Sequence, residues 1–306
     1  MVIKTRNYAG QTGYTDDYRL LHEFLHRISS TGERVGLLEW VFWEWQTARD
    51  VYHADELANI GLWFNGGKLV AATPYEDHAN AVALCADNEH RHLLPEMMEH
   101  AVCHLAKDGA VRLIVDDSDD EAQRMAFARG FRPSQDKVQN ARLDITEKAT
   151  ACTLPDGYRV IGFDEEFDVR KYNRCMWFGF NHGPEAAPDD AEFLAWRDGC
   201  VSSPNGNRHL MTAVVAPDGE YAAHCTMWYK GGENAIVEPV ATQPHYRKLG
   251  LGRAVVLEAA RRCGELGAKR AFVGSAQQFY YNIGFCPVVN ETFWLLRTDA
   301  QGEGKP

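Results

Sequence analysis

The stretch AIVEPVATQPHYRKLGLGRAVV, residues 235–256, decides the fold of this chain. It predicts a strand, then a turn that carries Gly250 and Gly252, then a helix. Amide groups in the first turn of a helix have no partner within the helix, and the helix dipole places partial positive charge there. The glycines leave the backbone open to close approach, and Arg247 and Lys248 add formal charge beside it. The sequence therefore predicts an anion site at the start of this helix.

Two other phosphate-binding motifs do not fit these residues. A Walker loop needs four residues between its first glycine and a Gly-Lys-Ser/Thr ending, and the segment has no such run. The dinucleotide fingerprint needs a third small residue at the position that Val255 occupies. The remaining pattern is R-x-x-G-x-G after a strand. Its plain alternative is a glycine turn that caps an ordinary helix.

The residues around this pattern resemble a known family. The loop follows Gln243-Pro244-His245-Tyr246, and Tyr280 stands four residues before Gly284-Phe285. In this order they resemble the pyrophosphate loop and active-site tyrosine of the GNAT (GCN5-related N-acetyltransferase) superfamily of acyl-CoA N-acyltransferases. The resemblance is dense from residue 235 to residue 285 and thinner elsewhere. It implies an α/β fold with a mixed sheet, and acetyl-CoA as the co-substrate.

Composition excludes several other classes of function. The chain has 306 residues, which favours two domains, and its formal net charge of −11 argues against a nucleic-acid partner. No apolar run is long enough to span a membrane, and Met1-Val2-Ile3-Lys4 does not open a signal peptide. The eight cysteines form no C-x-x-C pair, so we expect free thiols and a cytoplasmic location. The oligomeric state stays open.

The second half of the chain repeats the first. Expected turns, loops and glycines recur at nearly constant offsets of 152, 156 and 154 residues, as a tandem duplication would produce. The pairs are 65–68 with 217–220, Arg91 with Arg247, and Gly130-Phe131 with Gly284-Phe285. We therefore expect two tandem GNAT-like domains, residues 1–147 and 158–306, joined by a polar linker at 148–157. A strand over 138–145 should close the first domain.

The first domain is expected to lack activity. Leu94 places a side chain where the second half has a glycine at the phosphate-binding face, and Pro95 has no N–H to donate. Glu96 brings negative charge to the same turn, and Ala126 stands at the tyrosine position. All these changes oppose the binding of a diphosphate or the acyl-transfer chemistry. The second domain should therefore contain the active site.

The expected chemistry is direct transfer of an acetyl group to an amine. Glu238 is the one ionisable side chain on its strand, and it suits a base because burial raises the pKa of a carboxylate. Its alternatives are a contact to a substrate ammonium and an ion pair. The resemblance implies that Tyr280 is the general acid, although Tyr280 could instead be a core residue, or Tyr281 could have the role. Pro239 marks a bulge or an edge, and the resemblance implies that the N–H of Val240 binds the thioester oxygen.

The expected binding residues fall into two sets. The set for coenzyme A follows the strand end and the loop: Val240, Ala241, Thr242, Arg247, Lys248, Leu249, Gly250, Leu251, Gly252, Arg253 and Ser275. The set for the acceptor lies at the end of a helix expected over 170–180: Trp177, Asn181 and His182. Aromatic rings near carboxylates suit a small cationic amine such as an amino sugar, a polyamine or a modified amino acid. Acidic residues on the surface and aromatic residues in the core would produce the same sequence without any role in substrate binding.

Three rival functions remain. A sensor could bind acyl-CoA without transferring the acyl group, and it would need neither Glu238 nor Tyr280. An aminoacyl or longer-acyl transferase could use the same fold. His22-Glu23-Phe24-Leu25-His26 matches the H-E-x-x-H pattern of zinc hydrolases, but no further metal signature follows it, so we expect no metal.

Overall fold

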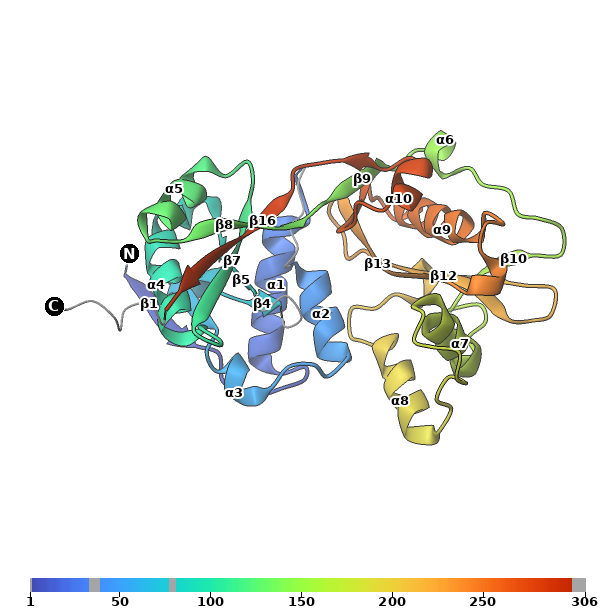
Figure 1. Ribbon diagram of the computed structural model, residues 1–306, viewed down its shortest axis with the longest axis horizontal. Coiled ribbons are helices and arrows are strands. Elements are labelled where there is room, and N and C mark those ends of the chain that lie inside the picture. Colours follow the sequence, from blue (N-terminus) through green and yellow to red (C-terminus); the bar gives the residue numbers. More distant parts are fainter. Residues whose placement is uncertain (1, 33–38, 77–80, 299–306) are drawn as a thin grey trace. The chain divides into compact units, whose positions relative to one another are not determined.

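The computed structural model describes residues 2–32, 39–76 and 81–298, and in it the chain divides into two compact units (Figure 1). Unit 1 comprises Met1–Ser29, Glu33–Asn140 and Val288–Pro306, and unit 2 comprises Ser30–Gly32 and Ala141–Pro287. Both units are mixed α/β, as expected. None of the helices described is both long and apolar enough to cross a membrane. All eight cysteines are free thiols, in agreement with the sequence-based expectation.

Unit 2 is built on one mixed sheet. Its strand order is β10-β11-β12-β13-β14-β9-β15, and every pair is antiparallel except β13–β14. The strands are β9 (Ala141–Asp144), β10 (Arg159–Gly162), β11 (Met211–Val215), β12 (Tyr221–Trp228), β13 (Asn234–Thr242), β14 (Arg270–Val273) and β15 (Cys286–Pro287). The central strand β13 belongs to the stretch that the sequence analysis identifies as decisive, and β12 is buried beside it.

Helices cover both faces of this sheet. Helix α9 (Leu251–Glu265) packs on one face, where Cys225 and Met227 of β12 join its apolar cluster. Helix α7 (Val169–Gly179) packs on the other face, where the ring of Tyr172 contacts the ring of His224. Figure 1 shows α9 and α7 on opposite sides of β12. Because side chains alternate along a strand, β12 contributes side chains to both cores. The remaining helices of unit 2 are α6 (Glu147–Thr150), α8 (Ala191–Cys200) and α10 (Gln278–Asn282).

The described residues of unit 1 form two smaller sheets. The first has the order β1-β2-β3-β6, and the second has the order β4-β5-β7-β16-β8. The strands are β1 (Ile3–Asn7), β2 (Gly61–Asn65), β3 (Lys68–Ala72), β4 (Tyr75–Glu76), β5 (Ala81–Ala83), β6 (Cys85–Ala86), β7 (Ala110–Asp116), β8 (Arg132–Val138) and β16 (Glu291–Arg297). The helices are α1 (Asp16–Ser29), α2 (Trp40–Ala48), α3 (Ala54–Leu57), α4 (Leu94–His104) and α5 (Asp120–Ala128).

Two strands belong to a different unit from the one that their position in the sequence suggests. The strand expected over 138–145 is in fact two strands: β8 ends at Val138 in unit 1, and β9 begins at Ala141 in unit 2. In return, β16 lies between β7 and β8 in the sheet of unit 1, although it follows all of unit 2 in sequence. The compact units are therefore not contiguous in sequence, and they differ from the boundaries 1–147, 148–157 and 158–306. Helix α6 includes residues 148–150 of the expected linker.

The strand registers confirm the internal duplication. In unit 1, Ala71 pairs with Ala86. In unit 2, Ala223 pairs with Thr242, at offsets of 152 and 156 from those residues. These are the offsets that the hairpin turns and the loop arginines show in the sequence. In each unit the ladder is interrupted in the strand before the loop, at Leu84 in unit 1 and at Glu238-Pro239 in unit 2.

Candidate active site

The N-terminus of α9 carries free amide groups. Gly250 is its N-cap in the left-handed conformation (φ 80°), and it offers no side chain to cap the helix. The first helical hydrogen bond runs from the N–H of Ala254 to the carbonyl of Gly250 at 3.0 Å. Among the described residues, the N–H groups of Leu251, Gly252 and Arg253 therefore have no partner. This is the local geometry that an anion requires.

The two glycines of the loop meet different needs. A Cβ on Gly250 would meet nothing within 4 Å, so the loop is open to solvent there. A Cβ on Gly252 would stand 2.9 Å from Thr242 Oγ1 and 3.2 Å from a ring carbon of Phe279. Gly250 thus leaves space for a ligand, and Gly252 lets the helix start pack against the end of β13.

A pocket of about 820 Å³ opens beside this helix start. It brings together ten of the residues expected from the sequence: Asn181, Val240, Thr242, Arg247, Lys248, Gly250, Leu251, Gly252, Arg253 and Tyr280. It also contains residues that the sequence analysis missed: Gly179, Phe180, Tyr246, Gln277, Phe279, Asn282 and Ile283. Most of these belong to the loop lead-in or flank Tyr280, so their closeness in sequence to the motif was the available signal.

Six expected residues lie outside this lining: Glu238, Ala241, Leu249, Ser275, Trp177 and His182. The side chain of Ala241 faces the core beneath α7, and Leu249 is exposed. Ser275 Oγ accepts a hydrogen bond from the N–H of Gln277 at 3.3 Å, which shapes the turn before α10.

Strand β13 separates from its neighbour beside the pocket. It pairs in parallel with β14 only from Asn234 to Ile236. Its register with β12 shifts between Val237 and Val240, so that Glu238 and Pro239 together face Thr226. This confirms the bulge expected at Pro239. Beyond Ile236, the edge of β13 that faces away from β12 has no strand partner among the described residues.

Glu238 lies in this bulge, and Tyr280 lines the pocket. The side chain of Glu238 is half-buried, and its backbone carbonyl accepts a hydrogen bond from Trp228 Nε1 at 2.6 Å. Tyr280 is 7% exposed and lines the pocket. Burial raises the pKa of Tyr280, and the nearby Cys225 and Glu238 raise it further, so the phenol stays protonated around neutral pH. Tyr281 packs against the core and does not line the pocket, which favours Tyr280 as the acid.

The cations of the loop have different surroundings. Arg247 Nε donates to the carbonyl of Thr242 at 3.0 Å, and Arg247 Nη2 donates to the carbonyl of Gly179 and to Asn181 Oδ1. Lys248 is exposed in the left-handed conformation (φ 65°). Arg253 is exposed, with one long hydrogen bond of 3.4 Å to the carbonyl of Ala151.

The expected acceptor residues lie together at the end of α7. The rings of Trp177 and His182 lie 4.9 Å apart, and Trp177 Nε1 donates to the carbonyl of Glu185. Asn181 is in the left-handed conformation (φ 58°), and its side-chain oxygen accepts from Arg247. Of the three, only Asn181 lines the pocket.

Comparison with known proteins gives the family of this segment. Residues 168–285 match the sequence profile described as the acetyltransferase (GNAT) family. Over this segment the chain is therefore similar to the GNAT acetyltransferases. No curated protein matches the sequence significantly.

Solved structures of GNAT proteins share the fold along nearly the whole chain. A GCN5-related N-acetyltransferase from Sphaerobacter thermophilus is 14% identical, with a TM-score of 0.54, over 97% of this chain and 96% of that one. A tandem GNAT protein from the clavulanic acid biosynthesis pathway is 15% identical, with a TM-score of 0.57, over 99% and 100%. A GNAT acetyltransferase from Colwellia psychrerythraea is 11% identical, with a TM-score of 0.58, over 97% and 100%. At these identities the likeness concerns the fold, and it confirms the tandem arrangement.

The GNAT loop has a different counterpart in unit 1. Arg91 forms ion pairs with Asp119 and Glu121 at 2.7 and 3.0 Å. The expectation that Leu94 covers the phosphate-binding face is wrong, because its side chain is buried in the core. The two helices begin at different positions of the repeat. Leu94 is the first residue of α4, whereas the corresponding Gly250 precedes the first residue of α9.

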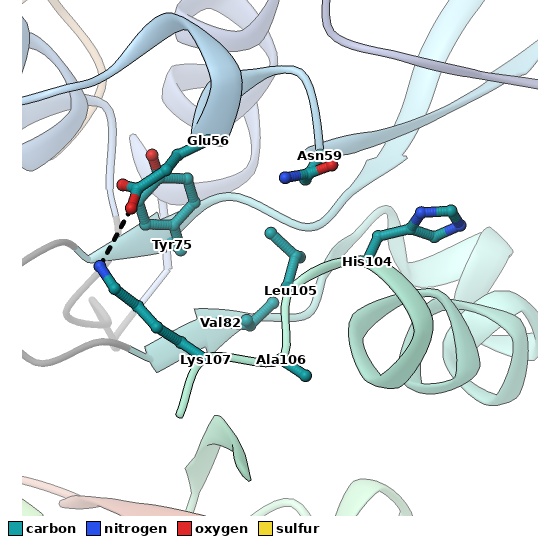
Figure 2. A pocket seen from close by; sticks show the side chains of 8 residues that line it. All are labelled: Glu56, Asn59, Tyr75, Val82, His104, Leu105, Ala106 and Lys107. Carbon is teal, nitrogen blue, oxygen red and sulfur yellow. Dashed lines mark hydrogen bonds and ion pairs between the residues drawn. The ribbon is translucent and has the colours of Figure 1, made fainter. Parts of the chain in front are cut away.

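Unit 1 has a small pocket at the opposite end of its helix. A space of about 120 Å³ lies beside His104, the last residue of α4. Figure 2 shows Val82 and Leu105 among the side chains that line it. At its rim Lys107 Nζ lies 3.0 Å from Glu56 Oε1. The GNAT pocket of unit 2 lies at the N-terminal end of α9, so the two pockets do not correspond.

The H-E-x-x-H sequence does not form a zinc-hydrolase arrangement. His22 is buried, with its Nε2 3.0 Å from Glu44 Oε2, whereas Glu23 is exposed. His26 packs edge-on against Trp40. Within the residues that the structure describes, no three potential ligands cluster around a metal position.

Proposed function

We propose that unit 2 is an acetyl-CoA-dependent N-acetyltransferase that acts on a primary amine of a small cationic substrate. The observation that carries this proposal is the start of α9, where residues whose amide groups have no partner among the described residues line the pocket of about 820 Å³. The fit is chemical as well as steric, since Lys248 and Arg253 add positive charge and Gly250 leaves space.

Each part of the donor has residues suited to it. The N–H groups of Leu251, Gly252 and Arg253 would bind the diphosphate of coenzyme A. The edge of β13 near Val240 and Thr242 would pair with the amides of the pantetheine arm. The thioester would then lie near the bulge at Glu238-Pro239.

The transfer step uses groups on both sides of that bulge. The neutral amine nitrogen attacks the thioester carbon, and the N–H of Val240 stabilises the developing oxyanion. Glu238 accepts the proton that the amine loses, directly or through a water molecule. The carbon–sulfur bond then breaks, and Tyr280 donates its proton to the leaving thiolate. A protonated Tyr280 is available because burial raises its pKa.

The proposed class of amine substrate is based on the net charge of the protein and on aromatic rings at the end of α7. A formal net charge of −11 favours association with a cation. The paired rings of Trp177 and His182, near the end of α7, offer faces for cation–π contact.

Calorimetry with coenzyme A tests donor binding. We expect the wild-type protein to bind it, and Gly250→Val to raise the Kd about tenfold or more, because the new side chain covers amides that bind charge. Gly231→Val is the matched control, since Gly231 also has positive φ (95°) and open space but lies away from the loop. Absence of binding by the wild type would contradict the proposal.

Thiol release from acetyl-CoA tests transfer. A panel of spermidine, glucosamine, lysine and a neutral aromatic amine should give release that depends on at least one cationic amine. Binding of coenzyme A without release for any amine would favour the sensor function. Release with longer acyl-CoA donors but not with acetyl-CoA would favour a longer-acyl transferase.

A further inference from the structure

The guanidinium of Arg247, which lines the pocket, joins the end of α7 to the end of β13. Arg247 Nε donates to the carbonyl of Thr242, the last residue of β13, at 3.0 Å. Arg247 Nη2 donates to the carbonyl of Gly179, the last residue of α7, at 2.9 Å, and to Asn181 Oδ1 at 3.0 Å. These contacts occupy donors that a diphosphate would otherwise use.

The end of α7 can approach β13 only because of its sequence. A Cβ on Gly179 would stand 2.8 Å from the Cβ of Ala241 and 3.1 Å from the backbone nitrogen of Thr242. Asn181 then takes a left-handed conformation (φ 58°) that turns its side-chain oxygen to Arg247. A cation at the last carbonyls of α7 also complements the negative end of the helix dipole.

This end of α7 is one wall of the pocket. Gly179, Phe180 and Asn181 line it, and Thr242 and Gly252 line it from the strand and the loop. Its position relative to β13 therefore sets the space for the donor arm. We infer that Arg247 is a positioning residue, which holds the end of α7 against β13 and so fixes the width of the pocket mouth. The part of this inference that concerns donor binding rests on the proposed function.

The charge for the diphosphate then comes from other residues. Lys248 has no hydrogen-bond or ion-pair partner among the described residues, and Arg253 has a long hydrogen bond to the carbonyl of Ala151 and a contact with the thiol of Cys152. Lys248 and Arg247 are neighbours in the same loop with different surroundings. Lys248→Met is therefore the matched control for Arg247→Met.

Hydrogen exchange of the ligand-free protein tests the first step. Arg247→Met should accelerate exchange of the amides of Phe180, Asn181 and His182 about tenfold or more, because hydrogen bonds to a charged group are lost. Arg247→Lys should restore part of the protection, and Asn181→Ala should have a smaller effect. Lys248→Met should leave these amides unchanged. Unchanged exchange in Arg247→Met would overturn the inference, whether or not the protein binds coenzyme A.

Comparing coenzyme A with pantetheine, which lacks the diphosphate, tests the second step. If Arg247 sets the width of the mouth, Arg247→Met raises the Kd of both probes by the same factor, about fivefold to tenfold. Lys248→Met should raise the Kd of coenzyme A alone. Loss of affinity for coenzyme A alone in Arg247→Met would identify a direct diphosphate contact. A lower melting temperature with unchanged Kd values would indicate a role in stability only. Either of these two results would overturn the inference.

Discussion

Tyr280 packs edge-on against Phe285, with ring centroids 5.4 Å apart and an interplanar angle of 70°. Phe285 is 2% exposed and belongs to the core beneath α9, so it fixes the tyrosine ring while the ring still lines the pocket. This packing explains why a tyrosine can be both a core residue and a candidate acid. The two interpretations of Tyr280 that the sequence leaves open are therefore compatible.

Tyr280→Phe should separate catalysis from binding. The ring packing is retained, so the Kd for coenzyme A should change less than about twofold. Loss of a general acid should slow transfer about 100-fold. Thiol release with the most active amine of the panel measures the rate, and calorimetry measures the Kd. Tyr281→Phe is the control and should leave the rate unchanged; a slower Tyr281→Phe with an unaffected Tyr280→Phe would exchange the two roles.

Gly179→Ala should destabilise unit 2. The added methyl would stand 2.8 Å from the Cβ of Ala241, and overpacking of this kind costs about 1–3 kcal/mol. Urea denaturation gives the change in unfolding free energy. Gly199→Ala is the control: Gly199 is exposed on α8 and a methyl there would meet nothing within 4 Å, so alanine should stabilise the helix by up to about 1 kcal/mol. Equal effects of the two substitutions would contradict the close approach at Gly179.

His224 should make unit 2 sensitive to acid. Burial, opposed by a hydrogen bond to the backbone of Thr212 and assisted by the charge of Arg197, lowers the pKa of His224 to about 3, so the folded protein holds this imidazole neutral. The unfolded chain binds the proton at about pH 6.5. Stability from this residue is thus complete above pH 6.5 and falls by about 1.4 kcal/mol per pH unit between about pH 6.5 and 3. Urea denaturation at pH 7, 6 and 5 should show a steeper decline for the wild type than for His224→Gln; parallel declines would exclude His224 as the cause.

A chain that ends at Pro287 should lose the fold of unit 1 and keep that of unit 2. Without β16, strands β7 and β8 have no neighbour between them, and Phe293 and Trp294 no longer contribute roughly 3–6 kcal/mol of burial. Hydrogen exchange should become fast in β7 and stay slow in α9. A chain that ends at Thr298 keeps β16 and should match the full protein. Retained protection of β7 in the shorter chain would contradict the strand assignment.

The sequence predicts the parts that local chemistry determines. The loop at Gly250, the bulge at Pro239 and the hairpins that recur at offsets of 152 and 156 all depend on residues close together in the chain. The exchange of β9 and β16 was not predicted, because the residues 138–145 read as one continuous strand. Their division depends on which sheet each part completes.

The acceptor side of the site was predicted least well. Trp177 and His182 pair with each other and lie outside the pocket lining. Arg247 was expected to bind the ligand through its charge, but its guanidinium donates hydrogen bonds to oxygens of Thr242, Gly179 and Asn181, at the ends of β13 and α7. In both cases the direction of a side chain depends on helix α7, which lies far from the loop in sequence. Motif spacing carries no information about such contacts.

The place of β16 also bears on how this protein is made. During translation, every residue of unit 2 leaves the ribosome before Arg297 does. Until then, the nascent unit 1 lacks β16, the strand that pairs with both β7 and β8. The two bare strand edges invite pairing with other chains. The N-terminal part of the molecule therefore completes its folding last, although it is synthesised first.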